Sequence, residues 1–202
     1  MGSAELQSDT TPPDAKLDGR LLRSERSRQL IIAAMIELVG EGNLIPTAQQ
    51  VAERADVGIR SVFRHFDDMD SIFETTNAIM LEVTKPLFVG GDRSGTIEVR
   101  ILHATEQLTN GYASAKNFLL SGKIRMWNTP VVKKNYILSQ RRIQKELEDW
   151  IPEILSLPEL DKQSAYALAS FDYWLQLREV QNASNKDCVE IISNQISYLF
   201  PK

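Results

Sequence analysis

The spacing of apolar residues constrains the fold most, because after a polar start it is helical along nearly the whole chain. No segment of any length alternates polar and apolar residues as a half-buried strand would. The pattern therefore predicts an all-α fold. The predicted helices cover residues 24–39, 47–55, 59–66, 68–85, 96–112, 116–127, 130–150, 161–181 and 185–200.

Composition narrows the class of protein. The 202 residues are 43% hydrophobic and 25% charged, which suits a globular chain with a core. No apolar run approaches the length of a transmembrane helix, and the first twenty residues lack the apolar stretch of a secretory signal. The single cysteine, Cys188, excludes an intrachain disulfide and a cysteine-based zinc site. We expect a cytoplasmic protein.

Residues 47–66 carry the most informative local pattern. Thr47 and Gln50 have the T-x-x-Q spacing of a capping box, which starts a helix of about two turns. A tight turn at 56–58 leads to a second short helix, in which Val62 and Phe66 lie one turn apart on the inner face. Two short helices joined in this way form a helix-turn-helix, whose second helix fits the major groove of DNA.

The similarity to one family is closer than this general motif. Residues 24–73 resemble the DNA-binding domain of the TetR family of bacterial transcriptional regulators, and the string VAERADVGIRSVFRHFDDMDSIF follows the family pattern without a gap. Four positions depart from that pattern. Asp56 replaces a turn glycine, Gly58 replaces a Ser or Thr cap, and Phe63 and Met69 replace a Tyr and a Lys that commonly contact phosphate.

The resemblance implies an architecture and a function. We expect a flexible arm at 1–22, a helix-turn-helix DNA-binding domain at 23–70, and a helical domain at 71–202 that binds a ligand and dimerises. The protein would be a ligand-responsive regulator, with repression as the expected outcome. A homodimer would bind a pseudo-palindromic operator of double-stranded DNA, with an unidentified small molecule as effector.

The resemblance also assigns expected DNA contacts. Arg60 and Ser61 are expected at base edges and Ile59 at a thymine methyl group, while arginines of the arm and first helix would add contacts. All seven basic residues in 20–67 are arginines, which suit phosphate and guanine, although a solvated helix face would have the same composition. The predicted DNA-binding residues are Thr47, Ile59, Arg60, Ser61, Phe63, Arg64, His65 and Arg28, and Arg20 and Arg23 are further candidates.

The C-terminal half allows weaker assignments. Aromatic residues with a few polar groups suit an apolar ligand, although each such residue is more often part of the core. The candidate pocket residues are His103, Tyr112, Phe118, Met126, Trp127, Tyr136 and Trp174. By the resemblance, the last two helices form the dimer face, and an intramolecular core is the alternative. The candidate dimer residues are Ala165, Ala169, Tyr173, Val189, Ile192 and Ile196.

Two other functions stay open. An enzyme is disfavoured, because the two histidines and one cysteine form no nucleophilic or metal-ligand pattern and no phosphate-binding loop is present. We therefore predict no cofactor and no metal. A protein of regulator shape that has lost DNA binding is favoured slightly by the net charge of −4 and by Phe63 and Met69.

Overall fold

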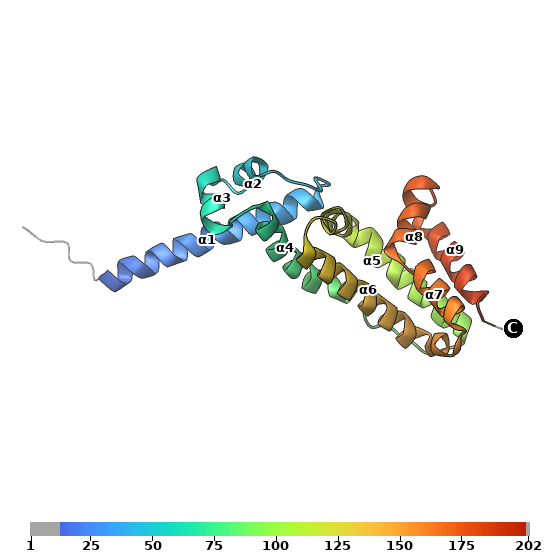
Figure 1. Cartoon of the computed structure of the whole chain (residues 1–202). Coiled ribbons are helices and arrows are strands. Elements are labelled where there is room, and N and C mark those ends of the chain that lie inside the picture. Colours follow the sequence, from blue (N-terminus) through green and yellow to red (C-terminus); the bar gives the residue numbers. More distant parts are fainter. Residues whose placement is uncertain (1–12, 201–202) are drawn as a thin grey trace, which may run out of the picture.

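The computed structural model describes residues 13–200, in which every regular element is a helix (Figure 1). This confirms the predicted all-α class. The elements are α1 (Pro13–Gly40), α2 (Ala48–Arg54), α3 (Ile59–His65), α4 (Met69–Thr84), the 3-10 turn η1 (Lys85–Leu87), α5 (Ile97–Arg125), α6 (Pro130–Trp150), the 3-10 turn η2 (Pro152–Ser156), α7 (Glu159–Leu168), α8 (Phe171–Leu175), the π-helical turn η3 (Gln176–Val180) and α9 (Asn185–Ser197). None of these helices is long and apolar enough to cross a membrane.

The N-terminal lobe is built from α1 to α4 around one apolar cluster (Figure 1). Ile31 and Met35 of α1, Val51 of α2 and Val62 of α3 are fully buried in it. The predicted capping box is confirmed at α2, since the Gln50 amide donates to Thr47 Oγ1 at 3.3 Å and the Thr47 amide donates to Gln50 Oε1 at 2.9 Å.

In the turn between α2 and α3, Asp56 occupies the position at which the TetR family pattern has glycine. Asp56 has a φ of 51°, in the left-handed region that Asp tolerates better than most residues. Gly58 is the N-cap of α3 and provides no side-chain cap. The helix-turn-helix therefore keeps its geometry with these two departures.

The C-terminal lobe surrounds α5, which packs against α6 and α9 (Figure 1). Its core contains the aromatic side chains of Tyr112, Phe171 and Trp174, each 1% exposed. The Tyr112 hydroxyl donates to the Ala169 carbonyl at 2.7 Å, so this buried polar atom is satisfied.

Three polar contacts join the lobes through the C-terminal half of α5. The Asn117 amide donates to the Gly40 carbonyl at 2.8 Å, and the Ser121 hydroxyl donates to the Leu44 carbonyl at 2.7 Å. One turn further, Arg125 Nη1 forms an ion pair with Asp70 Oδ1 at 2.9 Å. These contacts fix α5 to the end of α1 and to the start of α4.

The first helix begins much earlier than predicted. The expected helix at 24–39 lies within α1, which starts at Pro13 and takes in residues 13–22 of the predicted flexible arm. Pro is favoured in a first helical turn, and Gly19 alone does not stop the helix. The other arm residues, 1–12, lie outside the described part of the chain.

The predicted break between 96–112 and 116–127 is wrong, because α5 runs through it without interruption. Gly111, which the predicted helix 96–112 already includes, has a packing role in α5. A Cβ atom at this position would lie 2.6 Å from Cε1 of Phe88, so the absence of a side chain lets η1 and its flanking Phe88 pack against α5.

The predicted helix 161–181 is divided in the structure. The chain leaves the helix at Ala169, and Ser170 starts α8 by accepting a hydrogen bond from the Tyr173 amide at 3.2 Å. The sequence offers Asp161 as a cap for the predicted helix 161–181, and this is wrong as well, because α7 begins at Glu159 with Pro158 as its N-cap. By contrast, the S-x-x-D spacing of Ser184 and Asp187 predicts a cap, and these residues form the capping box of α9.

Candidate nucleic-acid interface and ligand cavity

The outer face of α3 combines cationic and apolar side chains. Val62 and Phe66 hold the helix in the N-terminal core, at 0% and 6% exposed. On the opposite side Ile59 is 40% exposed and Phe63 is 50% exposed, one turn apart. The arginines Arg60 and Arg64 are exposed on the same short helix.

These arginines have no structural task within the lobe. The ion pairs that the described residues of α1, α2 and α3 form with one another join Arg54 to Glu37 and Glu41 and leave Arg60 and Arg64 unpaired. The Arg54 pair is bidentate, with Nη1–Oε1 and Nη2–Oε2 distances to Glu41 of 2.9 and 2.7 Å, and it holds α2 against α1. Arg60 and Arg64 are thus available to an anionic partner.

The extended α1 adds a second cationic feature beside α3. Arg64 lines a shallow hollow together with Arg20 and Arg23 of α1. Ser24 and Ser27 complete its polar lining. Guanidinium and hydroxyl donors in one concave site suit a phosphate oxygen.

Two predicted DNA contacts are already engaged in the lobe. The guanidinium of Arg28 lies over the Phe66 ring, 5.2 Å from its centroid. His65 Nε2 is buried without a hydrogen-bond partner, so this nitrogen is not available for the predicted DNA contact. Burial, reinforced by Arg64 and Arg28, lowers the pKa of His65 and favours the neutral ring.

The remaining predicted contacts are accessible to different extents. Thr47 is exposed at the start of α2, but its hydroxyl already takes part in the capping box, which also includes a bond to Gln50 Oε1 at 3.2 Å. Ser61 is half-buried in the first turn of α3.

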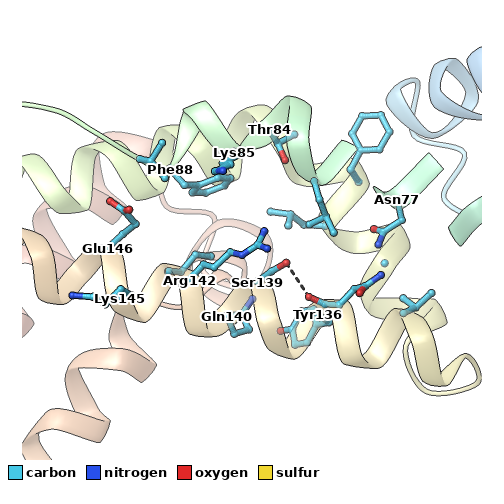
Figure 2. A pocket seen from close by; sticks show the side chains of 18 residues that line it. Asn77, Thr84, Lys85, Phe88, Tyr136, Ser139, Gln140, Arg142, Lys145 and Glu146 are labelled. Carbon is cyan, nitrogen blue, oxygen red and sulfur yellow. Dashed lines mark hydrogen bonds between the residues drawn. The ribbon is translucent and has the colours of Figure 1, made fainter. Parts of the chain in front are cut away.

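A cavity of about 330 Å³ lies between α4, η1, α5 and α6 (Figure 2). Its wall is mainly apolar, with polar groups on α4 and α6 and charged groups at η1 and along α6. Its apolar residues include Leu81, Phe88, Phe118, Leu119 and Ile143; the polar residues are Asn77, Thr84, Asn135, Tyr136, Ser139 and Gln140; the charged residues are Lys85, Arg142, Lys145 and Glu146.

Two of the seven predicted pocket residues line this cavity, Phe118 and Tyr136. Burial raises the pKa of the Tyr136 hydroxyl, which donates to Asp172 at 3.2 Å. Within residues 13–200, no group of His, Cys, Asp and Glu side chains is arranged to hold a metal ion.

The other five predicted pocket residues lie elsewhere, because aromatic character alone does not separate core from cavity. Tyr112 and Trp174 are buried in the C-terminal core. The His103 ring packs edge-on to Trp150 with centroids 6.3 Å apart, and Met126 packs against the N-terminal core. Trp127 is 71% exposed.

Sequence reasoning missed the wall formed by α4 and η1. Leu81, Thr84 and Phe88 belong to it, whereas Ile72 and Phe73 of the same helix are buried in the N-terminal core. One helix therefore contacts the core below α3 with one half and the cavity with the other. The available signal was the presence of apolar residues on two sides of the predicted helix 68–85.

The predicted dimer face also needs correction. Ala165, Ala169, Ile192 and Ile196 are at most 3% exposed and form the core of a single chain, so they are not available to a partner. Their small or apolar character serves intramolecular packing. Tyr173 and Val189 are half-buried, and the Tyr173 hydroxyl donates to Gln195 Oε1 at 2.7 Å.

Comparison with known proteins supports the fold. No protein-family model and no curated protein sequence matches the chain. A transcriptional regulator from Rhodococcus sp. RHA1 superposes with a TM-score of 0.63 at 16% identity, over 87% of this chain and 95% of that chain. A Pseudomonas aeruginosa PAO1 protein assigned as a transcriptional regulator gives 0.62 at 14% identity, over 85% and 89%.

A third structure carries the family name. A TetR transcriptional regulator from Rhodococcus sp. RHA1 superposes with a TM-score of 0.55 at 18% identity, over 87% of this chain and 97% of that chain. The similarity extends through the helical C-terminal lobe as well as the helix-turn-helix. The chain therefore has the fold of the TetR-type transcriptional regulators.

Proposed function

We propose that this protein is a ligand-responsive transcriptional regulator that binds a pseudo-palindromic operator in double-stranded DNA as a homodimer. Repression is the expected outcome of binding, and the α4–α6 cavity takes the effector. The structural neighbours are transcriptional regulators, which supports the general class. The DNA-binding part of the proposal depends mainly on the outer face of α3.

That face has the chemistry that a major-groove helix needs. Arg60 is exposed, unpaired within the described residues and able to form a bidentate contact with guanine. Ile59 and Phe63 are apolar, 40% and 50% exposed, and suited to thymine methyl groups and sugars. The hollow beside Arg64 gives the DNA backbone a separate contact on α1.

The ligand response follows from the position of α4. A ligand changes DNA affinity only if it binds one arrangement of the two lobes better than another. Because α4 contributes Ile72 to the N-terminal core and Leu81 to the cavity wall, a ligand that moves α4 also moves the support of α3. In a dimer this changes the spacing of the two recognition helices.

Salt-dependent binding to duplex DNA tests the proposal. Fluorescence anisotropy with a labelled duplex pool of random sequence should show an affinity that falls steeply between about 50 and 200 mM salt, because phosphate contacts release counterions. Arg64→Ala should weaken binding to all sequences and lower the salt slope by about one. Arg141→Ala, an exposed arginine on α6, is the matched control and should leave both unchanged.

The opposite result would favour the alternative function. If the folded protein shows no salt-dependent affinity for duplex DNA, it is a small-molecule or partner-binding protein with a regulator fold. The loss of the phosphate-contacting Tyr and Lys at Phe63 and Met69 would then explain the change.

A further inference from the structure

We propose that the cavity between α4, η1, α5 and α6 binds a carboxylic acid with an apolar body, with its carboxylate at Lys85 and Arg142. This inference rests on the proposed function, whose effector it assigns to a chemical class.

The cavity wall selects an apolar body. The apolar part of the wall comes from all four surrounding elements or their flanks, through Leu81, Phe88, Leu119 and Ile143. The volume of about 330 Å³ is at the small end of ligand pockets. A water molecule occupies about 30 Å³ in the liquid and a methylene group is similar in size, so a chain of about ten carbons fits.

The charges at the edge select an anion. Lys85 and Arg142 line the cavity from opposite sides, on η1 and α6, and neither forms an ion pair within residues 13–200. Figure 2 shows the Arg142 guanidinium reaching from α6 toward the side of the cavity formed by α4 and η1. A guanidinium and an ammonium that line one cavity match the two oxygens of a carboxylate.

The other two charged residues of the wall have partners of their own. Glu146 Oε2 lies 2.7 Å from Arg93 Nη2, and Lys145 forms an ion pair with Asp149 on the same helix. The charges of Glu146 and Lys145 are therefore balanced by these partners, which leaves Lys85 and Arg142 as the charged lining residues without an ion pair in the described part of the chain. The wall thus favours an anion and disfavours a cation.

Calorimetric titration of the full chain without DNA tests this assignment. The probes are decanoate, 1-decanol and decylammonium, which share one apolar chain and differ in charge. We expect decanoate to bind at one site per chain, more tightly than decanol, and decylammonium to bind most weakly. Lys85→Met and Arg142→Gln should each weaken decanoate binding by up to about tenfold, as expected for partly exposed charge pairs, and leave decanol unchanged.

Two further variants serve as controls. Arg141→Gln changes the exposed neighbour of Arg142 that does not line the cavity, and it should leave decanoate binding unchanged. Ser139→Leu fills the cavity from α6 and should weaken decanoate and decanol together. The proposal is overturned if decanoate does not bind, if decanol or decylammonium binds as tightly, or if Arg142→Gln and Lys85→Met both leave decanoate binding unchanged.

The outcome is separable from that of the proposed function. Ligand binding is measured on the free protein, so a failure to bind DNA does not affect it. Conversely, decanoate can fail to bind while the protein still binds DNA with salt dependence. In that case the regulator assignment stands and the ligand class is wrong.

Discussion

At the scale of single residues, the side chains of α3 and its C-cap fall into two groups, those that pack in the lobe and those that are exposed to a partner. Val62 and Phe66 are buried, whereas Arg60 and Arg64 are exposed and have no carboxylate partner within the described residues of the N-terminal lobe. His65 is half-buried, and its Nε2 atom is enclosed by the lobe. In α3 and its C-cap, changes at the exposed arginines are therefore expected to affect DNA binding, whereas changes at the buried residues are expected to affect stability.

Arg60→Ala should relax sequence preference. A bidentate contact with a base contributes about 1–3 kcal/mol of discrimination, whereas random duplexes lack the matching base. We expect the variant to lose affinity for a selected operator and to change little on random DNA, measured by competition binding. Equal losses on both kinds of duplex would refute a base-reading role for Arg60.

His65 should make the fold sensitive to acid. Its pKa in the folded chain is lowered by burial and by the neighbouring arginines, so the unfolded chain takes up the proton at a higher pH. The contribution to stability is therefore fully present above the unfolded pKa of about 6.5 and is lost as the pH falls toward the folded value. Urea titrations should show that His65→Gln flattens the loss of unfolding free energy between about pH 7.5 and pH 5. If the unfolding free energy of the variant falls with pH as steeply as that of the wild-type chain, His65 is not the cause of the acid sensitivity.

At the scale of elements, sequence patterns predicted helices better than their interruptions. The starts at Thr47 and Ser184 have capping boxes, which are local signals, and both were predictable. The predicted break at 113–115 is absent from α5, and the close packing of Phe88 on Gly111 is a contact between residues distant in sequence that local patterns do not show. The cavity could not be predicted for the same reason. Its wall on α4 and η1 is defined only once the fold places α6 opposite.

Gly111 and Gly122 allow a matched test of that packing within α5. Gly111→Ala places a Cβ atom 2.6 Å from Phe88 and should reduce the unfolding free energy by about 1–3 kcal/mol, as overpacking does. Gly122→Ala meets only Asn77 Oδ1 at 3.9 Å and should gain up to about 1 kcal/mol from helix propensity.

Shortening the opposing side chain tests the cause. Adding Phe88→Leu to Gly111→Ala should recover part of the lost stability in chemical denaturation. If Gly111→Ala is as stable as Gly122→Ala, the close approach of Phe88 does not constrain the helix.

At the scale of the whole molecule, two lobes are joined by α4 and by the contacts of α5 (Figure 1). The Arg125–Asp70 pair lies at this junction, with the guanidinium over Phe73 at 4.6 Å. The proposed dimer adds a second copy of this arrangement. We propose that the dimer uses the outward side of α8 and α9, because the inward residues of these helices are buried in one chain.

Val189 provides a test of the dimer. It is a half-buried apolar residue on α9, and a charge placed in a dimer face costs several kcal/mol unless it is paired. We expect the wild-type chain to scatter light as a dimer and Val189→Glu to shift toward monomer at the same concentration. Ile137→Glu, a 42% exposed residue on α6, is the control and should remain dimeric. A fully dimeric Val189→Glu would exclude this face.

Selection of bound duplexes from a random DNA pool, at two salt concentrations, tests the central claim most directly. We predict recovery of a pseudo-palindrome whose half-sites are about one helical turn or a multiple of it apart, because two recognition helices of a dimer impose that spacing. The same sequence should be recovered at both salt concentrations, with lower yield at the higher one. Recovery of no sequence above background by a folded, dimeric protein would contradict the assignment of α3 as a recognition helix.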